Sequence, residues 1–428
     1  MDKNEIVRKN REFMFPALST YYREPLVLSS GNGSYLYDID GNEYLDFFGG
    51  VLTVSVGHCN PEISEKIAEQ VKKLQHTSTL YLNREIVSFA EKLAEIAPGK
   101  LKKSFITNSG TEANETAILT AKMYTGYNEI VTLRHSYHGR SALVMTMAGH
   151  SNWKIGGSHV PGVLYAHNAY CFRCPFKLTY PECDVQCAVD LEELIATESC
   201  GKIAAFIAEP IQGVGGFITP PKEYFKKIYD IVKKYGGIFI SDEVQTGFGR
   251  TGKHWWGIGH YGVVPDMITC AKGIANGVPC GVTITTDEIA DSLKGTTFST
   301  FGGNPVSSVA ALATIEYMEK KNVRENAHRV GEYLRDRLLE LQEKYPFIGE
   351  VRGMGLMQAL EIVKKDRSPA ADKTTQILEA AKAHGLLVGR AGLYGNALRI
   401  TPRLDCRKTE IETGTGILDK AFSEIIRE

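Results

Sequence analysis

The chain has 428 residues, of which 49 are Lys or Arg and 50 are Asp or Glu, so its formal net charge is −1. Hydrophobic residues make up 43% and charged residues 23%, which is ordinary globular usage and excludes a disordered or fibrous protein. A nearly neutral chain offers no basic surface to a nucleic acid. Its length corresponds to two or three structural units at ~150 residues each.

The first fifteen residues carry the acids Asp2, Glu5 and Glu12 and no long apolar run. They therefore lack the features of a signal peptide and of an acid-poor organelle leader. No stretch approaches the ~18 apolar residues of a membrane span, so no membrane partner is expected. We expect a cytoplasmic protein whose nine cysteines are reduced thiols.

Helices and strands alternate along the first three quarters of the chain. One helix is predicted to begin at Asn60-Pro61, and a second to end at Pro98-Gly99. Short apolar runs then predict strands at Ser104–Thr107, Glu129–Leu133, Ile203–Ala208, Ile238–Ser241, Met267–Cys270 and Gly281–Thr285. Several of these runs are apolar on both faces, as in strands covered by helices on both sides. The pattern predicts an α/β domain with a mainly parallel sheet.

The pattern changes after Pro305. Two long helices are predicted at Ser307–Glu319 and Val323–Lys344, followed by short strands around Gly349–Ile362 and at Leu398–Thr401. This order is typical of a smaller α+β domain. We expect three parts: an N-terminal segment, 1–55, that packs with the small domain, a large α/β domain, 56–305, and the small domain, 306–428.

Residues that directly follow the strands are the first candidates for a site, because ligands bind at the carboxyl ends of parallel strands. Ser109-Gly110-Thr111 lies where a strand turns into a helix, and free amides at a helix N-terminus suit a phosphate. Ser109 with Glu112 also fits a capping box, which needs no ligand. Tyr137-His138-Gly139 follows the next strand, where the aromatic ring either stacks on a flat cofactor or packs in the core.

Charged residues end three further strands. Glu209 follows one apolar run, and Asp242, which begins Asp242-Glu243-Val244-Gln245, follows the next. Asp242 fits a turn cap or a buried carboxylate that keeps a basic ring nitrogen protonated. Lys272 is either an ordinary solvated lysine or an amine of lowered pKa that can form a Schiff base.

Two further patterns resemble ligand sites. Gly247–Lys253 matches a dinucleotide motif and the body of a P-loop, but His254 replaces the required Ser or Thr and the acidic run comes first, so both interpretations are rejected. Four cysteines, with C-x2-C-x8-C-x3-C spacing, form either a structural zinc site or a thiol-rich loop: Cys171, Cys174, Cys183 and Cys187. Their spacing lies outside the common zinc sets, which favours the loop, and no metal is expected.

The order of the strand-end motifs, together with Ser299–Pro305, resembles the class III pyridoxal-phosphate-dependent aminotransferases. The match extends from Gly41 to Arg399, and Tyr44–Cys59 is most similar to the alanine–glyoxylate and β-amino-acid–pyruvate branch. The resemblance implies fold type I: a large domain with a mainly parallel sheet, a smaller α+β domain, and a homodimer or larger oligomer with shared active sites.

The resemblance also implies a role for each site residue. Lys272 is expected to bond to pyridoxal 5'-phosphate and to act as catalytic base, with Asp242 at the pyridine nitrogen and Arg399 at the substrate carboxylate. Glu209 is expected to neutralise Arg399 when a substrate lacks an α-carboxylate. The other cofactor contacts are Ser109, Gly110 and Thr111 at the phosphate, Tyr137 and Val244 at the two ring faces with His138 nearby, Gln245 at the ring hydroxyl, and Thr300 at the phosphate of the neighbouring subunit.

One position departs from the family pattern, because Pro402 is followed by Arg403 where relatives often have a second proline.

We expect ping-pong transamination from alanine, β-alanine, 3-aminoisobutyrate or 4-aminobutyrate to pyruvate or glyoxylate, ahead of 2-oxoglutarate. The alternatives are an amino-acid racemase or aminomutase of the same fold, and a 4-aminobutyrate- or ornithine-type 2-oxoglutarate aminotransferase.

Overall fold

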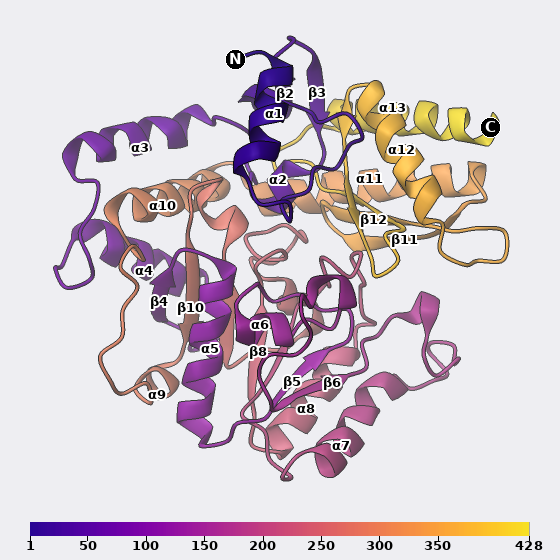
Figure 1. Cartoon of the computed structure of the whole chain (residues 1–428). Helices are drawn as coiled ribbons and strands as arrows, with labels where there is room; N and C mark the ends of the chain where they lie inside the picture. The colour runs from indigo at the N-terminus through magenta and orange to yellow at the C-terminus, as the bar shows by residue number, and fades with distance from the viewer. Residues whose placement is uncertain (428) are drawn as a thin grey trace.

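A seven-stranded sheet of order β4-β10-β9-β8-β7-β5-β6 forms the centre of the computed structural model, which describes residues 1–427 (Figure 1). Its strands are β4 (Lys103–Thr107), β5 (Ile130–Leu133), β6 (Val163–Ala166), β7 (Ala205–Ala208), β8 (Ile238–Asp242), β9 (Met267–Cys270) and β10 (Gly281–Thr285). Strands β5 to β9 pair in parallel, whereas β10 runs antiparallel to both β4 and β9. The mainly parallel sheet is confirmed, and six of its strands point to one edge.

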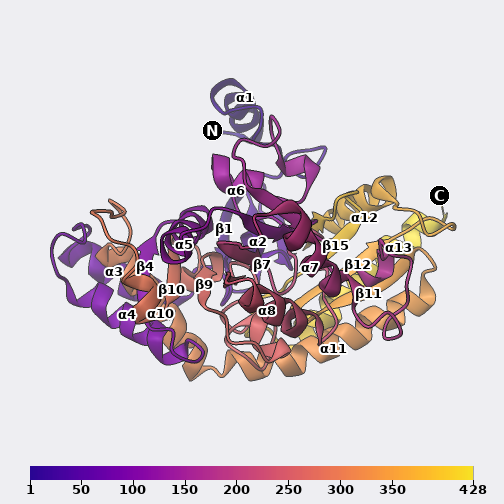
Figure 2. The ribbon, with the colours of Figure 1, turned by 90° about the horizontal axis from the view of Figure 1, so that it is seen from below.

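Helices cover both faces of this sheet, as the apolar runs predicted. The helices of this part of the chain are α3 (Pro61–Lys73), which packs on α10 and not on the sheet, α4 (Arg84–Ile96), α5 (Gly110–Thr125), α6 (Ala142–Thr146), α7 (Gln186–Glu198), α8 (Tyr224–Lys234), α9 (Asp287–Ala290) and α10 (Pro305–Lys320). Ile207 of β7 packs with Ile118 of α5, while the adjacent Phe206 lies in the core of the other face with Phe225 of α8. Figure 2 shows α5 and α6 on one side of the strands and α8 on the other.

Residues after α10 form an α+β unit, as expected. Its elements are α11 (Val323–Lys344), β11 (Ile348–Met354), β12 (Met357–Ile362), α12 (Ala371–Ala383), β13 (Leu386–Leu387), β14 (Gly389–Ala391), β15 (Ala397–Ile400) and α13 (Lys408–Arg427). Four of the strands form an antiparallel sheet of order β11-β12-β15-β14. This sheet carries Arg399 and covers one side of the large sheet's carboxyl edge.

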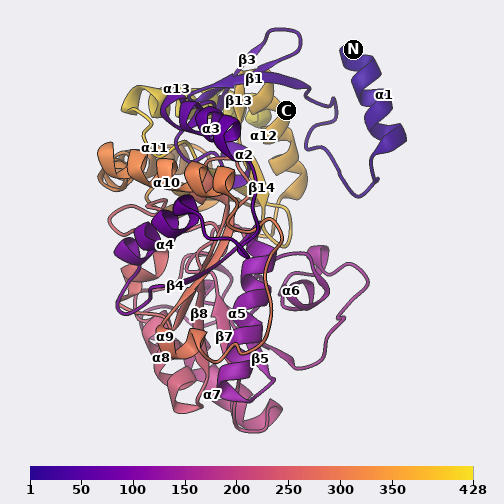
Figure 3. The ribbon, with the colours of Figure 1, turned by 90° about the vertical axis from the view of Figure 1, so that its left-hand side faces the viewer.

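The N-terminal residues contribute α1 (Lys3–Phe13), β1 (Leu28–Asn32), β2 (Tyr35–Asp38), β3 (Glu43–Asp46) and α2 (Gly49–Leu52). Helix α1 has no buried residue and stands away from the rest of the chain in Figure 3. Strand β3 pairs in parallel with β13, so a third sheet, β1-β2-β3-β13, joins both ends of the chain. The sequence did not predict this sheet or β6.

We propose that the chain has three structural parts: an N-terminal segment, 1–55, a large domain, 56–305, and a small domain, 306–428. The pairing of β3 with β13 supports the packing of the N-terminal segment with the small domain. Helix α10 begins at Pro305, the last residue of the large part, and packs along α3 and α4, so it connects the large part to the small one. Within residues 1–427, none of the helices is both long and apolar enough to cross a bilayer.

Candidate active site

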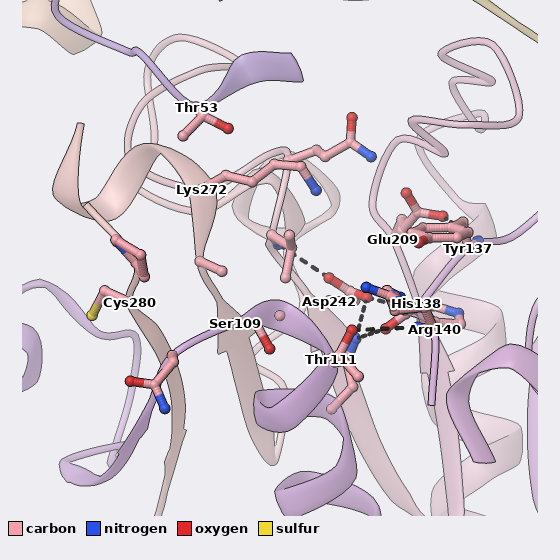
Figure 4. Close-up of a pocket in the computed structure, with 18 of the residues that line it drawn as sticks. Thr53, Ser109, Thr111, Tyr137, His138, Arg140, Glu209, Asp242, Lys272 and Cys280 are labelled. Carbon is pink, nitrogen blue, oxygen red and sulfur yellow. Dashed lines mark hydrogen bonds and ion pairs between the residues drawn. The ribbon is translucent and has the colours of Figure 1, made fainter. Parts of the chain in front are cut away.

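A cavity of about 280 Å³ opens where the carboxyl ends of β4, β5, β7, β8 and β9 meet (Figure 4). Ten predicted residues line it: Ser109, Gly110, Thr111, Tyr137, His138, Glu209, Asp242, Val244, Gln245 and Lys272. Other lining residues were not singled out as site residues by the sequence analysis, among them Thr53, Asn108, Asn114, Arg140, Gly277, Val278, Pro279 and Cys280. Thr300 and Arg399 do not line this cavity.

The N-terminus of α5 forms one wall of the cavity. Ser109 caps the helix, and its Oγ accepts a hydrogen bond from the Glu112 amide at 3.2 Å. The predicted cap is confirmed, and it coexists with a ligand site because the first amides of a helix have no partner within it. A Cβ on Gly110 would lie 2.9 Å from Val244 Cγ2, so only glycine fits this turn. The arrangement suits a phosphate at the positive end of the helix dipole.

Asp242 lies at the end of β8, and neighbouring side chains fix its carboxylate. Its Oδ2 faces His138 Nδ1 at 2.7 Å and accepts a hydrogen bond from Asn114 Nδ2 at 2.9 Å. His138 is held in turn by Thr132, whose Oγ1 lies 3.2 Å from Nε2. Asp242 is only 2% exposed, so its negative charge is available to a proton on a buried ring nitrogen.

Asn114 is the main functional residue that sequence analysis missed. Its side chain also donates to the His138 carbonyl at 2.8 Å and accepts from Thr269 Oγ1 at 2.6 Å. The available signal was its spacing, because residues four apart on a helix share a face, and Asn114 lies four residues after Gly110.

Lys272 begins a short 3₁₀ turn, η4 (Lys272–Ala275), directly after β9. Its φ is +49°, a left-handed conformation that costs a non-glycine residue about 1–3 kcal/mol and is frequent at active sites. Burial lowers the pKa of its ammonium, although Asp242 and Glu209 oppose the shift. Figure 4 shows the side chain extending from the strand end across the cavity. A larger neutral fraction makes this amine a better nucleophile and base.

Glu209 is buried beside Tyr137. Its two oxygens accept hydrogen bonds from the backbone amides of Tyr137, at 3.1 Å, and Gly213, at 2.9 Å. Burial raises the pKa of this carboxyl. The Tyr137 ring packs edge-on against Trp153, with ring centroids 5.1 Å apart.

Gln245 carries an unused hydrogen-bond acceptor. Its Oε1 is buried and has no partner among residues 1–427. The side chain packs on Gly213, where a Cβ would lie 2.1 Å from Gln245 Nε2. A buried amide oxygen without a donor is costly, so it fits a hydroxyl group of a bound molecule.

Arg399 projects from β15 and is 4% exposed. Its guanidinium lies over the rings of Phe48, at 5.0 Å, and Phe217, at 5.8 Å, and Nη2 donates to Tyr21 Oη at 3.4 Å. Nε and Nη1 have no hydrogen-bond partner, and no carboxylate of residues 1–427 forms an ion pair with this side chain. Arg399 also lowers the pKa of Lys272, which places its charge near the cavity. A buried, unpaired fork of this kind suits a carboxylate ligand.

Thr300 lies on an exposed segment outside the cavity. Phe298 and Phe301 flank it and are 47% and 60% exposed. Thr300 therefore does not contribute to the site of its own chain.

The rejected nucleotide motif has a structural role. Gly249 and Gly252 pack against Arg324 and His328 of α11. Arg250 is 2% exposed, and its Nη1 donates to the carbonyls of Pro402, at 2.5 Å, and Leu356, at 3.3 Å. The loop thus ties the large sheet to the small domain, away from the cavity.

The four predicted cysteines come together around a separate small cavity: Cys171, Cys174, Cys183 and Cys187. Burial raises the pKa of Cys171 to about 11 and that of Cys187 to about 12. Within residues 1–427, no group of three or more His, Cys, Asp or Glu is arranged to hold a metal ion. The choice between a thiol-rich loop and a structural zinc site stays a prediction.

The groups that face the main cavity suit one kind of cofactor. A lysine amine can bond to an aldehyde, a fixed carboxylate can pair with a ring nitrogen, and a helix N-terminus can bind a phosphate. The unpartnered Gln245 Oε1 can accept from a ring hydroxyl. Pyridoxal phosphate carries all four of these groups, so the residues present fit it.

Comparisons with known proteins agree. The model of the class III aminotransferase family matches residues 19–422. Over 98% of its length the chain is 44% identical to alanine–glyoxylate aminotransferase 2 homolog 2, mitochondrial, of Arabidopsis thaliana, and spans 87% of that protein. It is 36% identical to leucine/methionine racemase of Thermococcus litoralis, with 99% and 96% covered.

Among solved structures, an amine transaminase from an uncultivated Pseudomonas species, in its PLP-bound form, superimposes with a TM-score of 0.91 at 32% identity, and 96% and 98% of the two chains are covered. These proteins and this chain share both the fold and most of their length. The chain therefore belongs to the class III family of aminotransferases.

Proposed function

We propose that this pyridoxal-phosphate-dependent aminotransferase moves an amino group from a small amino acid to pyruvate or glyoxylate by a ping-pong mechanism. The donor class includes alanine, β-alanine, 3-aminoisobutyrate and 4-aminobutyrate. The similarity to an alanine–glyoxylate aminotransferase supports this choice. The observation that carries it is the unpaired, buried guanidinium of Arg399 near Lys272, because each of these substrates has a carboxylate.

Pyridoxal phosphate, when bound, supplies an electron sink for the carbanion that forms at the substrate carbon. We propose that Asp242, aligned by His138 and Asn114, holds a proton at the ring nitrogen, where the buried carboxylate favours the cation. The remaining contacts would be Ser109, Gly110 and Thr111 with the phosphate, Tyr137 and Val244 with the ring faces, and Gln245 with the ring hydroxyl.

Lys272 would have two tasks. Its Nζ would hold the cofactor through the aldehyde group, for which a lowered pKa is an advantage. The same Nζ would also serve as the general acid and base that moves the proton of the substrate carbon.

Arg399 would bind the substrate carboxylate through Nε and Nη1, which are its unpartnered nitrogens. We keep Glu209 as the group that neutralises Arg399 when a substrate lacks that carboxylate. The backbone amides of Tyr137 and Gly213 hold Glu209 in the structure, so pairing with Arg399 requires it to leave one of them. This exchange predicts slower binding of simple amines than of amino acids.

We further propose a homodimer with shared sites. Thr300 is exposed and outside its own cavity, so it can reach a cofactor phosphate only in a second copy. Light scattering of the purified protein tests this, since a monomer would exclude shared sites.

We keep the cytoplasm as the proposed compartment, which free cysteines support, although the Arabidopsis thaliana relative is named mitochondrial. Cell fractionation decides between the two.

The donor and acceptor are tested with a substrate panel. Purified enzyme is incubated with each donor class against pyruvate, glyoxylate and 2-oxoglutarate. The proposal expects the highest kcat/KM with pyruvate or glyoxylate. A clear preference for 2-oxoglutarate would favour the 4-aminobutyrate- or ornithine-type reaction instead.

Racemisation is the second candidate, because a leucine/methionine racemase is 36% identical to the chain. Incubation of enzyme with donor alone separates the two reactions. A transaminase stops after about one equivalent of 2-oxo acid per site, because the two half-reactions of a ping-pong cycle are separate. A racemase continues to form the opposite enantiomer without an acceptor.

A further inference from the structure

The small-domain sheet places two arginines on one face. Arg352 of β11 lies opposite Ala359 of β12, and Ala359 lies opposite Arg399 of β15. Directly opposed residues in a sheet point to the same side, so the two arginines share a face two strands apart, roughly 10 Å between backbones. Both are almost fully buried, at 5% and 4% exposed.

Glu361 of β12 can reach either arginine. It lies two residues from Ala359, and therefore on the same face, which makes it a diagonal neighbour of Arg352 and of Arg399. The structure pairs it with Arg352, whose Nη2 lies 2.6 Å from Glu361 Oε2. Three more donors hold this carboxylate: Tyr170 Oη at 2.5 Å, Arg173 Nε at 2.8 Å and Asn396 Nδ2 at 2.9 Å.

The pairing leaves one arginine neutralised and the other free. Burial opposes ionisation of Glu361, but the charge of Arg352 and these hydrogen bonds hold its pKa below the usual value, so it is a carboxylate. Arg352 Nη1 also donates to Glu350 Oε2 at 2.7 Å. Arg399 has no such partner among residues 1–427.

Arg352 also fixes the residue that covers Arg399. Its Nε donates to the carbonyl of Gly216 at 2.7 Å. Gly216 has φ of +98°, and a Cβ there would lie 2.9 Å from Ala397 Cβ, so the turn sits tightly on β15. The next residue, Phe217, is fully buried with its ring 5.8 Å from the guanidinium of Arg399.

We propose that Arg352 is a positioning residue for the carboxylate site: it keeps Glu361 away from Arg399 and holds Phe217 over it. The inference rests on the proposed role of Arg399 as the carboxylate-binding residue. Without Arg352, Glu361 keeps its ion pair with Arg173 through Oε1 but loses the cation at Oε2, and Arg399 is an unpaired cation on the same face of the sheet. An internal carboxylate then competes with the carboxylate of the substrate, which weakens amino-acid binding without altering the chemistry at Lys272.

The donor half-reaction tests this in the full-length, cofactor-loaded enzyme without acceptor. Its rate is followed by stopped-flow absorbance at increasing concentrations of alanine and of isopropylamine, a primary amine without a carboxylate. We expect Arg352→Gln to weaken the apparent affinity for alanine at least about tenfold, with the limiting rate and isopropylamine changed less than about twofold. The double variant Arg352→Gln with Glu361→Gln should recover most of the alanine affinity, because the competing charge is gone.

Equal losses for the two donors, or no recovery in the double variant, would overturn the inference. If Arg352→Gln does not fold, Arg352→Lys replaces it, because a single ammonium cannot hold Glu361, Glu350 and Gly216 together. It should lose alanine affinity several-fold and selectively, and a loss shared by both donors refutes the role. Arg399→Gln separates the two proposals: if it is not selective for alanine, the proposed function fails, and if it is selective while the Arg352 variants are not, only this inference fails.

Discussion

Replacement of Arg399 by methionine removes the charge at the proposed carboxylate site and keeps an apolar chain between Phe48 and Phe217. Two guanidinium nitrogens, Nε and Nη1, are free to donate to a carboxylate. A hydrogen bond to a charged group contributes about 1.5–3 kcal/mol, so the pair contributes about 3–6 kcal/mol. At about 1.4 kcal/mol for each tenfold, kcat/KM for alanine should fall roughly a hundred- to ten-thousandfold.

Although Arg399→Met should lower activity, it should not lower the free energy of unfolding. A buried cation without an acidic partner carries an uncompensated desolvation cost. Contacts with the two aromatic rings recover only about 0.5–2 kcal/mol. We therefore expect Arg399→Met to unfold at the same or a higher urea concentration than the natural protein.

Two assays check these expectations together: the stopped-flow half-reaction with alanine and isopropylamine, and equilibrium unfolding in urea. Arg390→Met is the matched control, because Arg390 lies opposite Leu398 on the adjacent strand and so points to the other face. It should change the two donors equally little. The reasoning is refuted if Arg399→Met affects both donors alike, or if its alanine loss accompanies a clear fall in the unfolding midpoint.

Three further outcomes are expected. Lys272→Ala should abolish multiple turnovers and the visible absorbance of the bound cofactor, and continued turnover would exclude this amine as the base. Burial raises the pKa of Glu209 from 4.5 to about 7. Its contribution to the free energy of unfolding is therefore fully present below pH 4.5, the pKa in the unfolded chain, and is lost as the pH rises through about 7, the pKa in the folded protein. Urea unfolding of cofactor-free protein should therefore show the natural chain losing stability relative to Glu209→Gln between pH 4.5 and 7, and a constant difference would contradict this. Elemental analysis should find far less than one zinc per chain, whereas stoichiometric zinc would restore the four-cysteine site.

The strand-end residues could be predicted from the sequence because a parallel sheet brings consecutive strand ends to one edge. Asp242 and Lys272 each follow a mostly apolar, fully buried run, and the structure places both in one cavity. The local cap at Ser109 was equally readable, since capping depends only on residues within one helical turn. The strand β10 was predicted but its antiparallel direction was not, because all five of its residues are buried like those of its parallel neighbours and local sequence does not encode direction.

Residues that act through long-range pairing could not be predicted. Arg399 has no carboxylate partner because β12 and β15 pair in this register and because Glu361 forms its ion pair with Arg352 instead. Asn114 gains its importance from Asp242, which the sequence places in another segment. The spacing of Asn114 from Gly110 places it on the cavity side of its helix, but neither that spacing nor the position of Arg399 on a strand identifies the distant residues that these side chains pair with.

The pairing of β3 with β13 also orders events during synthesis. Leu45 and Asp46 of β3 pair with Leu386 and Leu387 of β13. These partners leave the ribosome only when synthesis of the chain is nearly complete. Until then β3 has an open hydrogen-bonding edge, and such edges recruit foreign strands. A chain truncated before residue 386 would therefore keep an exposed, unpaired edge at β3. Quality-control proteases and chaperones can recognise such an edge and remove the product.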